Sequence, residues 1–378
     1  MKYTIPIFIV GILLGSALFI PLVPALQEST IASVNKISVF ERKTFFQQNI
    51  LSLQNHRMQS TVFSLSDDFM FTPEEITLED DAFHGADTLH FTEWWYFDAM
   101  LNDGYSIQFI FQIYSMFNQN IVNAKLNVYH DGETVIKKDK LYLPQDFTTS
   151  TRIPLVMLNG ERVMSAKKID GHFEYLIELQ MDDIQAEFTF TGTTKGWKGD
   201  VTVGQWVVPL PKAQVEGTLT RGTTQLQLSG TGYHDHNYEI TAETGLYYGW
   251  YWGKMSTETA TITWSNIMPT WFLNEPLMVI NQGPDTIINI NPENIKIQAD
   301  EFMFANGYFI PGEFSIKATS ETVNLQATID VLDIHHVHVG PIKYWRYHVH
   351  TTGSLLMNNH EEIELIDEYQ ITEFIRFR

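Results

Sequence analysis

Apolar and polar residues alternate with a period of two along most of the chain after Pro73. In the stretch YSIQFIFQI (residues 105–113), every second side chain is apolar, which is typical of a β-strand with one buried face. The residues Asn102-Asp103-Gly104 precede this stretch, and Asp131-Gly132 separates two further alternating segments. Such residues supply the positive φ angles of tight turns, so the pattern predicts antiparallel hairpins.

The same texture continues toward the carboxyl end, as short strands broken by glycine, proline and asparagine. Examples are IQAEFTFTG (184–192), ATITWSN (260–266), FSIKATS (314–320) and VNLQATIDV (323–331). Strands this numerous, with almost no helical segments between them, indicate sandwiches or barrels rather than a parallel sheet. Because about 300 residues exceed one small barrel, we predict an all-β protein with two antiparallel β-barrel domains, 71–240 and 241–378, dividing near Glu239–Gly245.

The alternation breaks at HFTEWWYF (90–97), where Trp94, Trp95 and Tyr96 follow one another. Successive side chains of a strand point to opposite faces, so both faces of this strand carry large aromatic rings. A second aromatic run, GLYYGWYWGKM, occupies residues 245–255. We therefore expect the first strand to be covered on both sides.

The amino-terminal segment carries no charge from Tyr3 to Leu26 and follows a single lysine. A short basic start, an apolar core and a small-residue site at Val23–Ala25 are typical of a secretory signal peptide. The run is also long enough to span a bilayer, which takes about 20 residues, so an uncleaved membrane anchor is the alternative for residues 1–26. Both predict an extracytoplasmic protein, secreted or anchored. We expect residues 27–70, where apolar residues recur at helix-like spacing, to form a helical spacer.

Composition narrows the classes of function. The formal net charge of −21 argues against a nucleic-acid partner, because binding to phosphates needs a basic face. The chain has no cysteine, which removes disulfides, thiolate metal sites and cysteine nucleophiles. Hydrophobic residues make up 44% of the chain, enough for large cores.

Three motifs together resemble the carotenoid 1,2-hydratase family, also called hydroxyneurosporene synthases, and the wider AttH-like proteins. They are Glu-Trp-Trp-Tyr at 93–96, Gly-Tyr-His-Asp-His-Asn-Tyr at 232–238, and Gly-Trp-Tyr-Trp at 249–252. Near the carboxyl end, RYHVHTTGSL and IDEYQITEF resemble the closing strands of that family, with Glu368 in the place of its terminal glutamate. The resemblance covers nearly the whole of the chain after residue 88.

The resemblance implies two lipocalin-like β-barrels packed together, with a deep aromatic pocket for an isoprenoid or another apolar molecule. In the hydratases, water adds to a terminal carbon–carbon double bond without a cofactor, and relatives of similar architecture act in pericyclic cyclisations. Aromatic faces attract the carbocation that such a hydration forms. The expected substrate-binding residues are Trp94, Trp95, Tyr96, Tyr233, Tyr238, Trp250 and Trp252. We expect one of Trp94 and Trp95 to fill the first barrel, and the other to contact the second domain or the pocket.

One departure from the family concerns the proton donor. The aspartate that the family carries between its two tryptophans is Tyr251 here, and a tyrosine with a pKa near 10 is a poor acid toward an alkene. Asp235 or Glu93 would have to replace it, with His236 beside them. Two interpretations of Asp235-His236 are open: a structural corner, or an acid–base pair at the mouth of the pocket.

The environment of Glu93 also has two interpretations. Burying a carboxylate without a partner is costly, so Glu93 either faces water at a barrel rim or binds a partner, for which His236 and Arg346 are candidates. The catalytic candidates are therefore Asp235, His236, Glu93 and Tyr251.

The histidines of IHHVHVGPIKYWRYHVH (334–350) also have two interpretations. His336 and His338 would share one face of a strand, as would His348 and His350, and two such strands could offer imidazoles to zinc. The alternative is solvated histidines at a barrel edge, and we predict no metal.

Three functions fit these observations. The first is a cofactor-independent hydratase, lyase or isomerase acting on an apolar, isoprenoid-like molecule. The second is a carrier that binds such a molecule without chemistry, and the third is a structural protein that uses the barrels only as a scaffold. We favour the enzyme, with the carrier as the alternative.

Overall fold

The structure is a computed structural model that describes residues 72–86, 88, 90–116, 119–257, 259–339, 342–357 and 362–377. The predicted signal or anchor segment (1–26) and the predicted helical spacer (27–70) lie outside the described residues. The side chains of His338 and Glu368 lie outside them as well.

A twelve-stranded antiparallel sheet contains the first half of the described chain, in the order β4-β3-β2-β1-β12-β11-β9-β8-β7-β6-β5 with β10 beside β11. The short 3₁₀ helix η2 (Pro144–Asp146) precedes β5. The strands of this sheet are β1 (His90–Leu101), β2 (Tyr105–Met116), β3 (Gln119–His130), β4 (Glu133–Tyr142), β5 (Phe147–Thr149), β6 (Leu155–Leu158), β7 (Glu161–Ile169), β8 (His172–Met181), β9 (Ile184–Gly192), β10 (Trp197–Val201), β11 (Gly204–Arg221) and β12 (Thr224–Thr241).

A nine-stranded antiparallel sheet follows, in the order β16-β15-β14-β13-β23-β22-β21-β20-β17. Its strands are β13 (Gly249–Ser256), β14 (Ala260–Thr270), β15 (Leu273–Gln282), β16 (Thr286–Ile290), β17 (Ile295–Asp300), β20 (Glu313–Thr319), β21 (Val323–Val339), β22 (Ile342–Met357) and β23 (Glu362–Arg376). The remaining elements are a two-stranded hairpin and two 3₁₀ helices: β18 (Met303–Ala305), β19 (Tyr308–Ile310), η3 (Ala242–Leu246) and η4 (Pro292–Asn294).

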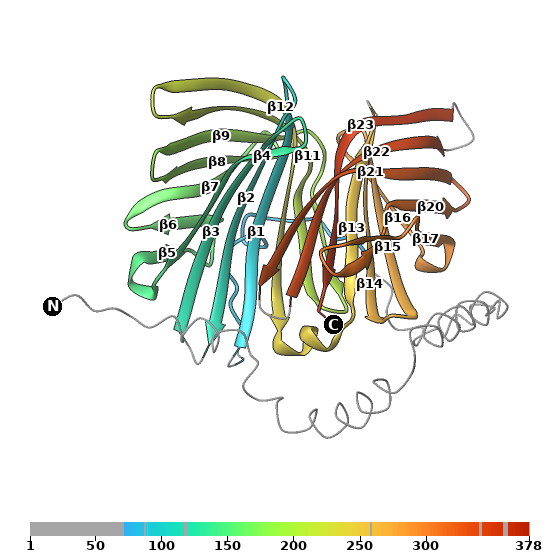
Figure 1. The fold of residues 1–378 in the computed structure, drawn as a ribbon, viewed down its shortest axis with the longest axis horizontal. Helices are drawn as coiled ribbons and strands as arrows, with labels where there is room; N and C mark the ends of the chain where they lie inside the picture. The colour runs from blue at the N-terminus through green and yellow to red at the C-terminus, as the bar shows by residue number, and fades with distance from the viewer. Residues whose placement is uncertain are drawn as a thin grey trace, which may run out of the picture. The chain divides into compact units, whose positions relative to one another are not determined.

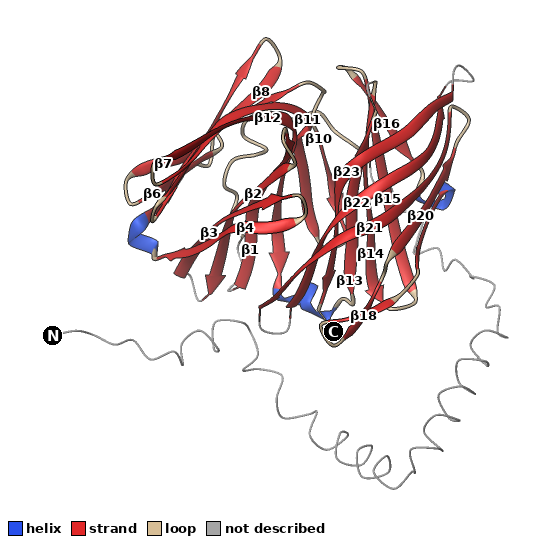
Figure 2. Ribbon diagram, turned by 45° about the horizontal axis from the view of Figure 1, so that its top comes forward, coloured by secondary structure: helices blue, strands red, loops and turns tan. Residues whose placement is uncertain are grey.

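Each large sheet curls into a nearly closed antiparallel β-barrel (Figures 1 and 2). The predicted all-β class with two antiparallel barrels is therefore confirmed. The chain passes from one sheet to the other between Thr241 and Gly249, and the predicted domain limits at residues 240 and 241 stay a prediction. Within the described ranges, no helix combines the length and the apolar character needed to cross a membrane.

The turn between β1 and β2 follows from its sequence. Asp103 and Gly104 both have positive φ angles, 55° and 73°, as a tight hairpin turn requires. Asp131 and Gly132 repeat this geometry between β3 and β4, with φ angles of 48° and 80°. Both predicted hairpins are present.

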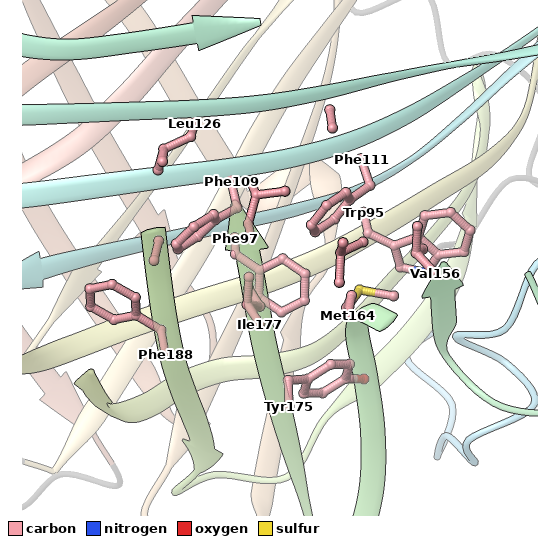
Figure 3. Close-up of a cluster of buried hydrophobic side chains, with 14 of the residues drawn as sticks. Trp95, Phe97, Phe109, Phe111, Leu126, Val156, Met164, Tyr175, Ile177 and Phe188 are labelled. Carbon is pink, nitrogen blue, oxygen red and sulfur yellow. The ribbon is translucent and has the colours of Figure 1, made fainter. Parts of the chain in front are cut away.

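Buried side chains form three apolar clusters. One fills the first barrel, where Trp95, Phe97, Phe109, Phe111 and Tyr175 lie together (Figure 3). A second fills the second barrel. The third contains side chains from both sheets, and it covers the other face of β1. The expectation that β1 is covered on both sides is thus correct.

Candidate functional site

Pairing of β1 with β12 brings two of the three sequence motifs together. In the register of these strands, Trp95 lies opposite His236 and Tyr96 opposite Asp235. Because side chains alternate between faces, the odd-numbered residues 233, 235 and 237 of β12 point one way, and the even-numbered residues point into the first barrel. The motif residues are therefore divided between two environments.

The first environment is a cluster of four ionisable side chains inside the first barrel, Asp81, Glu93, His234 and His236, which we call the first-barrel ion cluster. His236 Nε2 lies 2.9 Å from Glu93 Oε1, and His236 Nδ1 lies 3.2 Å from Asp81 Oδ1. His234 Nε2 lies 3.2 Å from the other oxygen of Asp81. All four side chains are fully buried.

The pairing fixes the charges in this cluster. Burial acts to raise the pKa of Asp81, but His234 and His236 lower it to about 2. Burial acts to lower the pKa of His236, but Asp81 and Glu93 raise it to about 9. At neutral pH, Asp81 is therefore ionised and His236 carries a proton. Opposite charges in contact stabilise one another in a medium that screens them poorly.

The chain segment before β1 supplies Asp81 and also binds Glu93. The backbone amides of His84 and Gly85 donate hydrogen bonds to the two carboxylate oxygens of Glu93, at 3.0 and 2.8 Å. The hydroxyl of Tyr175 donates to Asp81 Oδ2 at 2.6 Å, and the indole of Trp95 donates to the Asp81 carbonyl at 2.9 Å. Of the two partners predicted for Glu93, His236 is the one in contact.

The second environment lies between the two sheets and contains three carboxylates, Asp98, Asp235 and Glu373, which we call the interbarrel carboxylates. Arg346 Nη1 donates a hydrogen bond to Glu373 Oε1 at 3.0 Å and another to the Tyr96 hydroxyl. The same hydroxyl lies 2.7 Å from Asp98 Oδ2. Lys254 forms an ion pair with Asp98. Residues of both barrels thus neutralise one another across the interface.

Glu373 is the buried glutamate of the last strand. Tyr344 donates a hydrogen bond to its Oε1 at 2.6 Å. Burial raises the pKa of Glu373, although Arg346 and the two tyrosine hydroxyls act to lower it. The glutamate that sequence reasoning singled out in this strand was Glu368, five residues earlier, so Glu373 was missed.

Asp235 is the interbarrel carboxylate without a cation in contact. Its Oδ2 accepts hydrogen bonds from Trp206 Nε1 at 3.1 Å and from the Tyr233 hydroxyl at 2.9 Å, and its Oδ1 accepts one from Asn237 at 3.2 Å. Burial raises the pKa of Asp235 to about 7; Trp206 and Tyr233 act against this rise, while Glu373 and Asp98 add to it. A substantial fraction of Asp235 is therefore protonated at neutral pH.

The expected substrate-binding residues divide in the same way. Trp95 and Tyr238 belong to the core of the first barrel. The others belong to the cluster between the sheets: Trp94, Tyr96, Tyr233, Trp250 and Trp252. Tyr96 and Tyr233 each lie edge-on or tilted against Trp252, with ring centroids 5.7 and 5.1 Å apart. The prediction that Trp94 and Trp95 serve different sides of β1 is correct.

Two predictions about the catalytic candidates are wrong. Asp235 and His236 are neither a corner nor an acid–base pair, because they are consecutive residues in the middle of β12 and point to opposite faces. Tyr251 is near neither of them. Its ring packs against Phe314 and Phe374 inside the second barrel, since it alternates with Trp250 and Trp252 along β13.

His335, His336 and His348 adopt neither predicted arrangement. His348 is fully buried; its Nδ1 lies 3.2 Å from His335 Nε2, and its Nε2 lies 3.0 Å from the hydroxyl of Ser106 in the first sheet. His336 instead stacks on Trp345. A register shift between Val331 and Asp333 sets His348 beside His335. Among the side chains that the structure describes, no group of three histidine, aspartate or glutamate residues is arranged to hold a metal ion.

Two hollows on the described part of the protein are not lined by the interbarrel carboxylates. One is a surface depression lined by residues such as Glu75, His172 and Lys195, and another is lined by residues such as Arg162 and Glu187. The aromatic cluster between the sheets is closely packed.

The residues of the two charged clusters that sequence reasoning missed are Asp81, Asp98, Lys254 and Glu373. Asp81 belongs to the acidic run Glu79–Asp81, and nothing in the sequence separates it from its two neighbours. Asp98 offered the better signal, because it is a charged residue inside a strand of aromatic and apolar residues. Each of these residues is recognised only through partners far away in the chain.

Fold and site together define a class: an all-β protein with two antiparallel barrels and buried carboxylates where the sheets meet. The chain is 23% identical over 333 residues to hydroxyneurosporene dehydrogenase of Chlorobaculum tepidum, and the match covers 76% of this chain and 84% of that protein. This is distant homology, and it confirms the resemblance inferred from the motifs. No family model matches the chain.

Three solved structures share the fold. A protein provisionally named AttH from Nitrosomonas europaea matches with a TM-score of 0.59 at 13% identity, covering 81% of this chain and 97% of that chain. CghA with Sch210972 matches with a TM-score of 0.53 at 11% identity, covering 76% and 88%. Kievitone hydratase from Nectria haematococca matches with a TM-score of 0.50 at 12% identity, covering 82% and 98%. At such identities the likeness concerns the fold alone.

Proposed function

We propose that this protein is an exported enzyme with lipocalin-like barrels that adds water to, or isomerises, a carbon–carbon double bond of an apolar, isoprenoid-like substrate. The observation that carries the proposal is the environment of Asp235, a buried carboxyl group that accepts hydrogen bonds from Trp206 and Tyr233 and contacts no cation. Its carboxyl group is buried among aromatic rings, and its pKa is raised to about 7. Hydration of an isolated alkene requires an acid that keeps its proton near neutral pH inside an apolar site.

The surrounding residues suit the remaining steps. Asp235 gives its proton to one alkene carbon, and the other carbon becomes a tertiary carbocation, which the faces of Tyr233 and Trp252 stabilise. Water adds to the cation, and the resulting oxonium ion returns one proton to the Asp235 carboxylate, so the balance is the addition of one water molecule. Lys254 and Arg346 do not oppose the cation, because Asp98 and Glu373 pair with them.

The names of the similar proteins support an enzyme on a small apolar molecule. One is named a dehydrogenase of hydroxyneurosporene and another a kievitone hydratase. Between these two reactions, the protonated carboxyl of Asp235 favours hydration. Because the interbarrel carboxylates are buried, a substrate reaches them only when the surrounding side chains or the two sheets move apart.

A carrier without chemistry is the second candidate. It is favoured by Tyr251, which occupies the position of the family's aspartate and lies inside the second barrel against Phe314. Both candidates bind an apolar molecule, and turnover separates them.

The test uses an acyclic carotenoid with terminal isopropylidene groups, incubated with the full-length chain in isotopically labelled water. We expect a tertiary alcohol that carries the labelled oxygen. In Asp235→Asn, turnover should fall by about a hundredfold or more, while binding of the carotenoid persists. The matched control is Asp103→Asn in the exposed β1–β2 turn, which should keep the wild-type rate.

The outcomes separate the two candidates. Wild-type turnover in Asp235→Asn would refute the role of Asp235. Tight binding of the carotenoid by the wild-type chain without any labelled product would establish the carrier. Export has its own test, in which cell fractionation should find the folded chain outside the cytoplasm.

A further inference from the structure

Five exposed aromatic side chains lie on two hairpins of the second barrel. Trp271 and Phe272 form the β14–β15 turn and are 66% and 58% exposed. Phe302, Phe304 and Phe309 belong to the β18–β19 hairpin and are 54%, 67% and 66% exposed. We call these five residues the aromatic patch. None of the other exposed large hydrophobic side chains of the described residues is aromatic.

The β18–β19 hairpin is apolar on both faces. On its inner face, Ile310 is fully buried, and the ring of Tyr308 lies 5.5 Å from that of Trp345. On its outer face, Phe304 lies opposite Phe309 with ring centroids 5.3 Å apart. An antiparallel hairpin with one wet face normally places polar residues there. Two phenylalanines on the outer face therefore indicate a covering partner.

Both hairpins project from the same end of the second barrel. At this end, Gly249 of β13 pairs with Met268 of β14 and with Arg376 of β23. The β14–β15 turn begins at Trp271, three residues after Met268. Arg376 also lies over the ring of Tyr308, 5.5 Å from its centroid, which attaches the β18–β19 hairpin to the same end. Figure 2 shows β18 beside the carboxyl terminus and the lower end of β13.

We propose that this end of the second barrel rests on a lipid bilayer, with the aromatic patch inserted among the headgroups. Trp and Phe side chains are favoured at membrane interfaces, where their rings lie among the headgroups. A stable protein interface would need about 800 Å² of continuous surface on each side. The chain also carries an uncharged apolar run from Tyr3 to Leu26 that is suited to a membrane.

The charges at this end are mixed. The partly exposed Lys343 and Arg376 lie there and can approach lipid phosphates, but the exposed acids Glu243 and Glu301 lie nearby. The attraction must therefore come from the aromatic rings and not from charge. Vesicles of neutral phosphatidylcholine are the appropriate probe, and added salt should change the contact little.

The absence of cysteine allows a test with single labels on the full-length chain. A polarity-sensitive fluorophore is attached to Phe272→Cys, Phe304→Cys or Ile366→Cys, and vesicles with nitroxide groups near the lipid headgroups are added. Ile366 is the matched control, since it is 55% exposed on β23 toward the opposite end of the same barrel. The emission of the labels at 272 and 304 should shift to the blue and be quenched by the nitroxide groups. The emission of the label at 366 should show neither change.

In the double variant Phe304→Cys/Phe309→Ser, about tenfold more lipid should be needed for the same quenching, because the neighbouring ring is removed from the patch. The proposal fails if the chain sediments with vesicles while the labels at 272 and 304 stay in water, since another segment then holds the chain. It also fails if all three labels respond alike. A blue shift without vesicles that grows with protein concentration would assign the patch to a second copy of the chain.

Discussion

Asp235 and His236 are neighbours in β12, yet their environments differ in the one property that decides protonation. His236 lies between two carboxylates inside the first barrel, and its pKa is raised to about 9. Asp235 lies among aromatic rings between the sheets without a cation in contact, and its pKa is raised to about 7. Burial alone disfavours both charges. The comparison shows that partners, and not depth, decide which group is ionised.

The first-barrel ion cluster therefore holds its paired groups in fixed charge states, while Asp235 between the sheets has a pKa that a general acid can use. Ion pairing holds the pKa of Asp81 at about 2, far from the range in which a general acid works. Asp235, with a pKa of about 7, is within that range. Three predictions test this difference and a fourth concerns the aromatic patch, from the largest expected effect to the smallest.

Removing His236 should give the largest loss of stability. His236→Ala leaves Asp81 and Glu93 buried without the cation between them, which should lower the free energy of unfolding by about 3–5 kcal/mol. Urea unfolding at neutral pH measures the change. His172→Ala on the partly exposed face of β8 is the control. A loss below about 1 kcal/mol for His236→Ala would show that the cluster does not stabilise the fold.

The second effect is a pH dependence of stability that belongs to Asp235. The pKa of Asp235 is about 7 in the folded protein, above the ordinary value of 3.8. Protonated Asp235 therefore contributes to the free energy of unfolding an amount that is fully present below about pH 4 and is lost as the pH rises to about 7. Asp235→Asn removes this slope. The wild type should lose a few kcal/mol relative to the variant between about pH 4 and pH 8.

The other titratable groups are present in both the wild type and Asp235→Asn, so their contributions cancel in the difference in stability between the two proteins. His236, with its raised folded pKa, contributes stability that is complete below 6.5 and is lost as the pH rises through about 9, in the wild type and the variant alike. Parallel unfolding curves for the two chains from acid to neutral pH would contradict a raised pKa at Asp235.

A smaller effect should follow from loss of one hydroxyl group at the interface. Tyr96→Phe removes the oxygen that Arg346 contacts and the donor to Asp98, while the ring stays against Trp252. We expect a loss of about 1–2 kcal/mol in the free energy of unfolding. Tyr105→Phe, at a partly buried ring stacked on His130, should cost less than half of this. Equal losses of stability in Tyr96→Phe and Tyr105→Phe would show that the interbarrel hydrogen bonds of Tyr96 contribute no more than those of an ordinary tyrosine hydroxyl.

The smallest effect on stability should come from the aromatic patch. Phe304→Ser replaces a side chain that is 67% exposed and contacts Phe309 across the hairpin. The free energy of unfolding in solution should change by no more than about 0.5 kcal/mol. A loss of several kcal/mol would mean that the outer face of the hairpin belongs to the core.

The sequence predicted which residues matter better than it predicted how they meet. The motifs at 93–96, 232–238 and 249–252 supplied Glu93, His236, Asp235 and the aromatic residues between the sheets. Their division into two environments needed the strand assignment, because one position along a strand reverses the face. Glu373 could not be found from its neighbours, since its partner Tyr96 lies 277 positions away in the chain.

By itself, the sequence determined the alternation, the turns and the aromatic strands, because these depend on steric preferences and on a period of two that acts between near neighbours. The tertiary structure decided which carboxylates have cations beside them. Pairing of β1 with β12 set His236 against Glu93, and pairing of β22 with β23 set Glu373 against Arg346. Both depend on contacts across long stretches of chain and on burial. The pKa of Asp235 is therefore a property of the fold, and no local pattern contains it.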